Sequence, residues 1–150
     1  MIKYGPEVNL IEGENMLFVN RETKSTVPVP QVYAIYAVPG RCPRTNREED
    51  TNYIIMEYIE GKTLKDEWSS LSVQQKDNLS AQLRKYVNQL RSLPSPGYYG
   101  SIGRRGLLDC IFWTGDNSCE PLDGPFDTED EFNEAMCRKA LFNGYMGLID

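Results

Sequence analysis

A lysine and two glutamates near the N-terminus have the residue types and spacing to form an ion pair. Lys3 lies in MIKYG, which predicts the tail of a strand, and Glu12 and Glu14 lie in the helix predicted over 7–20. Both glutamates have apolar neighbours at helical spacing, and a charged side chain in such surroundings normally needs a partner. The spacing leaves three interpretations open: Lys3 pairs with Glu12, it pairs with Glu14, or the charges are simply solvated.

A second candidate is the segment YIIMEYIEGKTL, residues 53–64. It begins as a β-prone apolar run, turns polar at Glu57 and reaches Gly61. Two structures fit this pattern. One is the plain end of a surface hairpin. The other is a hinge, in which backbone groups just beyond the strand stay free to bind a ligand.

The composition excludes several kinds of chemistry. With 40% hydrophobic and 25% charged residues, the 150-residue chain is typical of one ordinary globular domain. The net charge of −6 argues against a nucleic-acid partner, which requires a dense basic surface. The chain has no histidine, which rules out Ser-His-Asp and Cys-His catalysis and removes the commonest metal ligand.

The cysteines and the apolar runs indicate where such a chain would be found. Cys42, Cys110, Cys119 and Cys137 form no CxxC pair, so free thiols in a reducing cytoplasm fit better than a zinc site. No apolar run approaches the roughly 18 residues of a membrane span. The N-terminus lacks the charged and apolar regions of a signal peptide. We therefore expect a cytoplasmic protein that does not contact membranes.

The first half of the chain predicts a small antiparallel sheet with one helix. After the strand tail at 1–4 and the helix at 7–20, residues 26–38 begin with two prolines and continue as a strand. A polar loop at 40–50 joins this strand to a second one at 52–58, which predicts a hairpin.

The second half predicts helices. Residues 71–93 form the best helical pattern, with Ser72 and Gln75 as a capping box and Pro94 as the stop. A turn-rich loop follows at 94–108, and Thr128 with Glu131 caps a further helix at 127–141. Three aromatic residues in this half fit core packing better than a substrate site: Tyr98, Tyr99 and Trp113.

A strand, one helix and a short antiparallel hairpin resemble the small lobe of a protein-kinase-like fold, in which a strand lysine pairs with a helical glutamate and contacts ATP phosphates. The chain is similar, more specifically, to the aminoglycoside phosphotransferase family, and to its large fungal branch. Six blocks carry the resemblance, in the family's order, over about residues 3–136: IKYG, EGENMLFV, TVPVPQVYAIY, YIIMEYIEGKTL, QLRSLPSPGYYGSIG and GPFDTEDEFNEAM. Each block alone is weak, whereas six in order make a specific match.

The resemblance implies roles at matching positions. Lys3 matches the lysine that holds the α- and β-phosphates, and Glu12 matches the helix glutamate that orients it. Met56 matches the residue at the back of the adenine pocket. The hinge matches Glu57, Tyr58 and Ile59, and the adenine contacts would be the Glu57 carbonyl and the Ile59 amide.

The resemblance also implies parts that this chain lacks. A complete member has a phosphate-covering glycine loop before the lysine strand, and a histidine-aspartate catalytic loop followed by a metal-binding aspartate. The chain has neither loop, so we interpret Asp150 in the closing GLID as a chance match and assign no catalytic and no metal-binding residue.

The expected fold class is α+β, a partial protein-kinase-like fold in which residues 1–58 are a small-lobe remnant ending in the hinge and 59–150 a mainly helical lobe fragment. By family the protein would be an ATP-dependent kinase, using ATP and Mg²⁺ to phosphorylate a hydroxyl of an unidentified small molecule. We expect this chain to be a truncated member that is inactive alone, and the partner that the resemblance implies is an adenine nucleotide. The alternative is a non-catalytic binding or interaction module derived from a kinase-like lobe.

Overall fold

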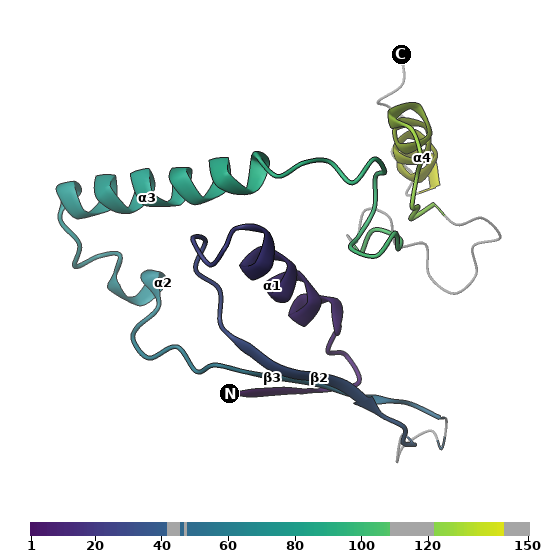
Figure 1. The fold of residues 1–150 in the computed structure, drawn as a ribbon, viewed down its shortest axis with the longest axis horizontal. Coiled ribbons are helices and arrows are strands. Elements are labelled where there is room, and N and C mark those ends of the chain that lie inside the picture. The colour runs from purple at the N-terminus through teal and green to yellow at the C-terminus, as the bar shows by residue number, and fades with distance from the viewer. Residues whose placement is uncertain (42–45, 47, 109–121, 143–150) are drawn as a thin grey trace. The chain divides into compact units, whose positions relative to one another are not determined.

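A computed structural model describes residues 1–41, 46, 48–108 and 122–142 of the chain. It has α+β architecture, as predicted, with a small antiparallel sheet and separate helices (Figure 1). By its internal contacts the chain divides into two compact units, Met1–Leu93 and Pro94–Asp150. The predicted division at residue 58 concerns the kinase-like lobes and remains a prediction.

The first unit is built on a three-stranded antiparallel sheet of order β1-β3-β2. Its strands are β1 (Ile2–Gly5), β2 (Val32–Val38) and β3 (Thr51–Met56). The predicted hairpin is confirmed, because β2 pairs with β3 in antiparallel register. The β1 strand pairs with the other edge of β3, so the chain's first residues lie beside a strand about fifty positions later.

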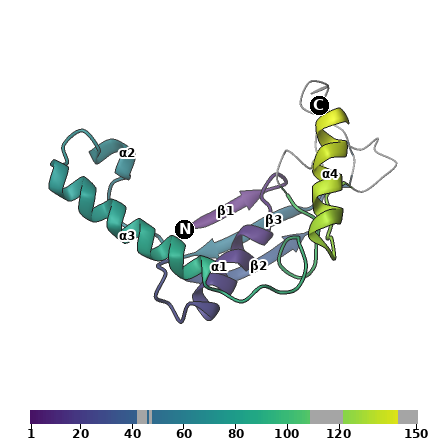
Figure 2. The ribbon, with the colours of Figure 1, turned by 90° about the horizontal axis from the view of Figure 1, so that it is seen from above.

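The two faces of the sheet differ sharply. Helix α1 (Ile11–Glu22) covers the face that bears Lys3, Ile35 and Ile54 (Figures 1 and 2). Ile54 is fully buried there and forms a core cluster with Val8 and Met56. The opposite face bears three tyrosines, one from each strand.

Those tyrosines form a continuous stack across the sheet. The Tyr53 ring lies 5.0 Å from that of Tyr36 and 5.8 Å from that of Tyr4, with interplanar angles of 10° and 11°. Tyr4 and Tyr36 are exposed, as is Ile2 on the same face. We refer to Tyr4, Tyr53 and Tyr36 as the tyrosine ladder.

Helix α1 begins four residues later than predicted. Residues 5–8 form a turn, with Pro6 and Glu7 in its centre, in which the Val8 N–H donates to the Gly5 carbonyl. The Asn9 side chain then accepts from the Ile11 N–H at the start of the helix. Val8 lies in this turn and not in the helix, and its apolar side chain is buried in the core.

Two further helices complete the first unit. The short helix α2 (Leu64–Glu67), which the sequence reading missed, begins at Thr63, whose hydroxyl accepts from the Asp66 N–H. Helix α3 (Val73–Arg91) has the predicted capping box, with Ser72 and Gln75 bonded reciprocally. None of its residues is buried.

The second unit is organised by helix α4 (Glu129–Phe142), whose predicted cap is also confirmed, since Thr128 accepts from the Glu131 N–H. The loop at 94–108 has the predicted lack of regular structure apart from short bridges. The Tyr99 ring stacks on Phe132 at 5.5 Å, which agrees with a packing role. The Tyr98 hydroxyl donates to the Ser101 carbonyl and accepts from the Arg104 N–H.

Some sequence expectations lie outside the described residues. These are Cys42, Cys110, Trp113, Cys119 and Asp150. Cys137, the remaining cysteine, is an exposed free thiol. No helix in the part of the chain that the structure describes is long and apolar enough to cross a membrane.

Candidate functional site

Lys3 and Glu12 form a direct ion pair between β1 and α1. The Lys3 Nζ donates to Glu12 Oε2 at 2.5 Å. Of the two glutamates that the helical spacing left open, Glu12 is therefore the partner. The side chains remain 43% and 48% exposed, so the ammonium is held by a carboxylate while still open to solvent.

The placement of this pair follows from the local structure. Antiparallel pairing sets Lys3 opposite Ile54, on the sheet face that α1 covers. Glu12 lies in the first turn of α1, where a negative charge also interacts favourably with the helix dipole. A strand residue and a helix residue are thus joined on the sheet's covered face.

The end of β3 is tied to Met1, the residue before β1. The Met56 N–H donates to the Met1 carbonyl at 3.0 Å, and the Met56 carbonyl accepts from the Met1 ammonium at 2.7 Å. The Met56 side chain is buried in the core. This leaves Met56 fixed in position but with both backbone groups occupied.

Beyond Met56 the chain leaves the sheet. The Glu57 N–H donates to the Gln31 carbonyl at 2.8 Å, and the Glu57 carboxylate accepts from the Gln31 N–H at 3.1 Å. Tyr58 and Ile59 are both exposed. Among the residues that the structure describes, neither the Glu57 carbonyl nor the Ile59 N–H has a hydrogen-bond partner.

This arrangement bears on the two interpretations of residues 53–64. A plain hairpin end would carry the chain directly into a turn and a partner strand, but residues 57–62 have no regular structure before α2. Within the part of the chain that the structure describes, the segment presents a carbonyl and an N–H without partners, two residues apart. Such a donor and acceptor can bind the edge of a flat heterocycle.

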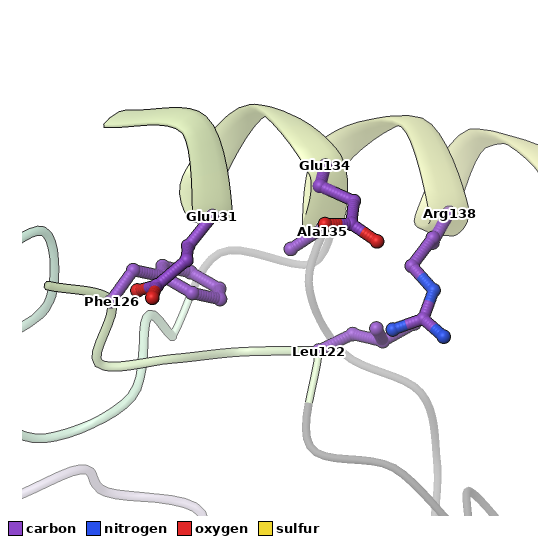
Figure 3. A pocket seen from close by; sticks show the side chains of 6 residues that line it. All are labelled: Leu122, Phe126, Glu131, Glu134, Ala135 and Arg138. Atoms are coloured by element: carbon purple, nitrogen blue, oxygen red, sulfur yellow. The ribbon is translucent and has the colours of Figure 1, made fainter. Parts of the chain in front are cut away.

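Hollows on the described surface lie elsewhere. In the first unit one is lined by α1 and the segment before β2: Leu17, Asn20, Ser25, Pro30, Gln31 and Val32. In the second unit another lies beneath α4, where Glu134 and Arg138 project from the helix and Leu122 faces them from the loop (Figure 3). Neither hollow contains the residues singled out from the sequence.

The described residues include no group of three or more carboxylate or cysteine side chains placed to hold a metal ion. The sequence reading missed Gln31 and Met1, which fix the end of β3 through backbone groups. Their side chains gave no chemical signal, because a backbone contact depends on strand register and not on residue type.

Comparisons with known proteins give no relatives. No family model, no curated protein and no solved structure matches the chain.

Proposed function

We propose that the chain binds adenine nucleotide at the end of its sheet, as part of an aminoglycoside phosphotransferase-like small-molecule kinase. The observation that carries the proposal is the Lys3–Glu12 ion pair, which holds an ammonium at the covered face of the sheet. A lysine oriented in this way by a helical glutamate binds ATP phosphates in kinase-like folds. The strand, helix and hairpin order of the first unit supports the same proposal.

The backbone beyond β3 supports the adenine half of the site. Adenine presents an amino donor beside a ring-nitrogen acceptor. The Glu57 carbonyl and the Ile59 N–H supply the complementary acceptor and donor, and Met56 would lie behind the base. The residues therefore suit ATP in their donors and acceptors. The described residues include no group of three or more carboxylate or cysteine side chains placed to hold Mg²⁺, so no step through the metal is assigned to this chain.

We further propose that the chain by itself transfers no phosphate. Phosphoryl transfer needs a residue that orients the attacking hydroxyl and groups that neutralise charge on the phosphates. The chain has no histidine for a histidine-aspartate catalytic loop. Loss of even one preorganised electrostatic group commonly reduces the rate by about 10²–10³.

Two measurements on the purified chain test this function. Equilibrium dialysis should detect weak ATP binding that Lys3→Ala reduces and Lys65→Ala leaves unchanged, since Lys65 is an exposed lysine on α2. A turnover assay with ATP, Mg²⁺ and a panel of hydroxylated acceptors should give no product. Turnover that survives repurification and disappears with Lys3→Ala would contradict the proposal of an inactive chain.

The surrounding genomic DNA offers a separate test of the family. An in-frame glycine loop upstream and a histidine-aspartate loop downstream would show that the chain is part of a complete kinase. Stop codons directly on both sides, with neither loop, would favour the module described next.

The alternative is a non-catalytic interaction module, and the tyrosine ladder is the observation that favours it. Tyr4, Tyr36 and Ile2 leave an exposed apolar face on the sheet, and β1 and β2 are both edge strands. Unprotected edges and apolar faces promote association. Light scattering at tens of micromolar would support this alternative by detecting association, and a monodisperse monomer would count against it.

A further inference from the structure

Gln31 and Glu57, one residue beyond the printed ends of β2 and β3, are paired in a way that departs from a regular antiparallel pair. In an antiparallel sheet, a hydrogen-bonded pair exchanges two bonds, each N–H donating to the carbonyl opposite. Gln31 and Glu57 make the first bond normally, from the Glu57 N–H to the Gln31 carbonyl. The second bond is replaced, because the Gln31 N–H donates to the Glu57 side-chain Oε2 and not to the Glu57 carbonyl.

The register between β2 and β3 shifts by one residue between Val32 and Ala34, so the Gln31–Glu57 pair lies just beyond a bulge. Met56 directs both backbone groups toward Met1 on the β1 side, so on the β2 side Met56 and Val32 form a non-bonded pair. The Glu57 N–H faces Gln31, as its bond to the Gln31 carbonyl shows, and in a regular pair the Glu57 carbonyl would accept from the Gln31 N–H. The Glu57 carboxylate thus takes the place of the Glu57 carbonyl as the acceptor for the Gln31 N–H.

We propose that the Glu57 side chain is a positioning residue that keeps its own carbonyl open to accept the 6-amino group of adenine. This inference rests on the proposed nucleotide binding and assigns Glu57 a part in selecting the base. A 6-oxo purine would set an oxygen against the open carbonyl, whereas a 6-amino purine sets a donor there. The selectivity for 6-amino over 6-oxo purines therefore depends on the Glu57 carboxylate, which accepts from the Gln31 N–H.

Removing the carboxylate should allow the Gln31 N–H to bond to the backbone carbonyl of residue 57. In Glu57→Ala the Gln31 N–H has no side-chain acceptor, so it bonds to the carbonyl of residue 57 and competes with the base. Glu57→Gln keeps an acceptor oxygen at the same reach and should preserve the open carbonyl. Both variants remove the negative charge of Glu57. A difference between them therefore does not arise from a changed electrostatic interaction with the nucleotide.

The first experiment needs no nucleotide. Scalar couplings across hydrogen bonds, measured by NMR on the full chain, identify the acceptor of the Gln31 N–H. We expect coupling to the Glu57 side-chain carboxyl carbon in the wild type and to the backbone carbonyl carbon of residue 57 in Glu57→Ala. A coupling to the backbone carbonyl already present in the wild type would overturn the inference.

The second experiment compares ATP with purine riboside triphosphate, which differs only in lacking the 6-amino group. The wild type and Glu57→Gln should prefer ATP, and Glu57→Ala should lose about threefold to tenfold of that preference, the loss expected for one hydrogen bond. Glu60→Ala serves as the control, because Glu60 is an exposed carboxylate in the same segment.

The outcomes separate this inference from the function on which it rests. If the wild type prefers ATP and Glu57→Ala keeps the full preference, the role of Glu57 is wrong and nucleotide binding stands. If the wild type binds neither triphosphate, the proposed function is wrong, and the base selection falls with it.

Discussion

Gly13 of α1 lies so close to Ile35 of β2 that a Cβ atom at position 13 would stand 2.7 Å from Ile35 Cδ1. The same Cβ would be 3.3 Å from Cγ2 of the fully buried Ile54. Gly13 is the third residue of α1, in its first turn, and a glycine in a helix costs up to about 1 kcal/mol in helix propensity. Its place here is explained by the close approach of α1 to the sheet, which brings the adjacent Glu12 within reach of Lys3.

Gly13→Ala should therefore destabilise the chain despite its better helix propensity. Overpacking typically costs about 1–3 kcal/mol, and the propensity gain recovers about 1 kcal/mol. We expect a net loss of up to about 2 kcal/mol in the free energy of unfolding, measured by urea denaturation. Asn15→Ala, at an exposed position of α1, is the control for propensity alone, and equal stabilisation by both substitutions would contradict the close packing.

The Lys3–Glu12 pair should matter for ligand binding and little for folding. Half-exposed ion pairs contribute about 0.2–1 kcal/mol. A double-mutant cycle with Lys3→Met and Glu12→Gln should give a coupling energy within that range by denaturation. The exposed pair of Lys62 and Glu67 offers a matched comparison at 2.6 Å. A coupling above about 2 kcal/mol would mean that the pair is structural.

Ser72→Ala should weaken helix α3 more than most surface substitutions would. The capping box satisfies two backbone groups of its first turn, and loss of such a cap costs about 0.5–2 kcal/mol. Because α3 buries none of its residues, packing offers little compensation, and far-UV circular dichroism should show a lower helix content. Ser80→Ala makes the same chemical change at an exposed interior position, where helicity should stay equal or rise.

Tyr53→Ala should remove two ring contacts at once, because Tyr53 is the middle member of the tyrosine ladder. Aromatic cross-strand pairs contribute about 0.2–1 kcal/mol each, so denaturation should show a loss of about 1 kcal/mol or more. Tyr33→Ala, at an exposed strand position outside the ladder, is the control. Equal losses in the two variants would show that ring stacking adds nothing to strand propensity.

The regular elements were predictable because their causes are local. The capping boxes at Ser72 and Thr128 and the apolar spacing behind them identified α3 and α4. The short helix α2 was missed, although Thr63 and Asp66 have the residue types and spacing of a cap. Four residues are too few to show helical periodicity, so the cap was the sole local sign of this helix.

The site was predictable in part. The resemblance indicated Lys3 and Glu12, and the contact between them is present, while their role in binding remains a prediction. The replacement of the Glu57 carbonyl by its carboxylate was not predictable, since it depends on the joint register of all three strands at Met56. The close approach of Gly13 to Ile35 was not predictable either, because it is a contact between α1 and β2. Local helix propensity indicates only that a glycine destabilises the helix.

The most direct test of nucleotide binding is an ATP titration of the 150-residue chain, followed residue by residue through backbone amide shifts. We expect the Ile59 and Lys3 amides to move together, with half-saturation in the millimolar range, a binding free energy near about −4 kcal/mol. In Lys3→Ala the same shifts should need more ATP, while Lys65→Ala should match the wild type. Amides of Ile59 and Lys3 that stay fixed up to about 10 mM ATP, or shifts confined to other parts of the chain, would contradict the account.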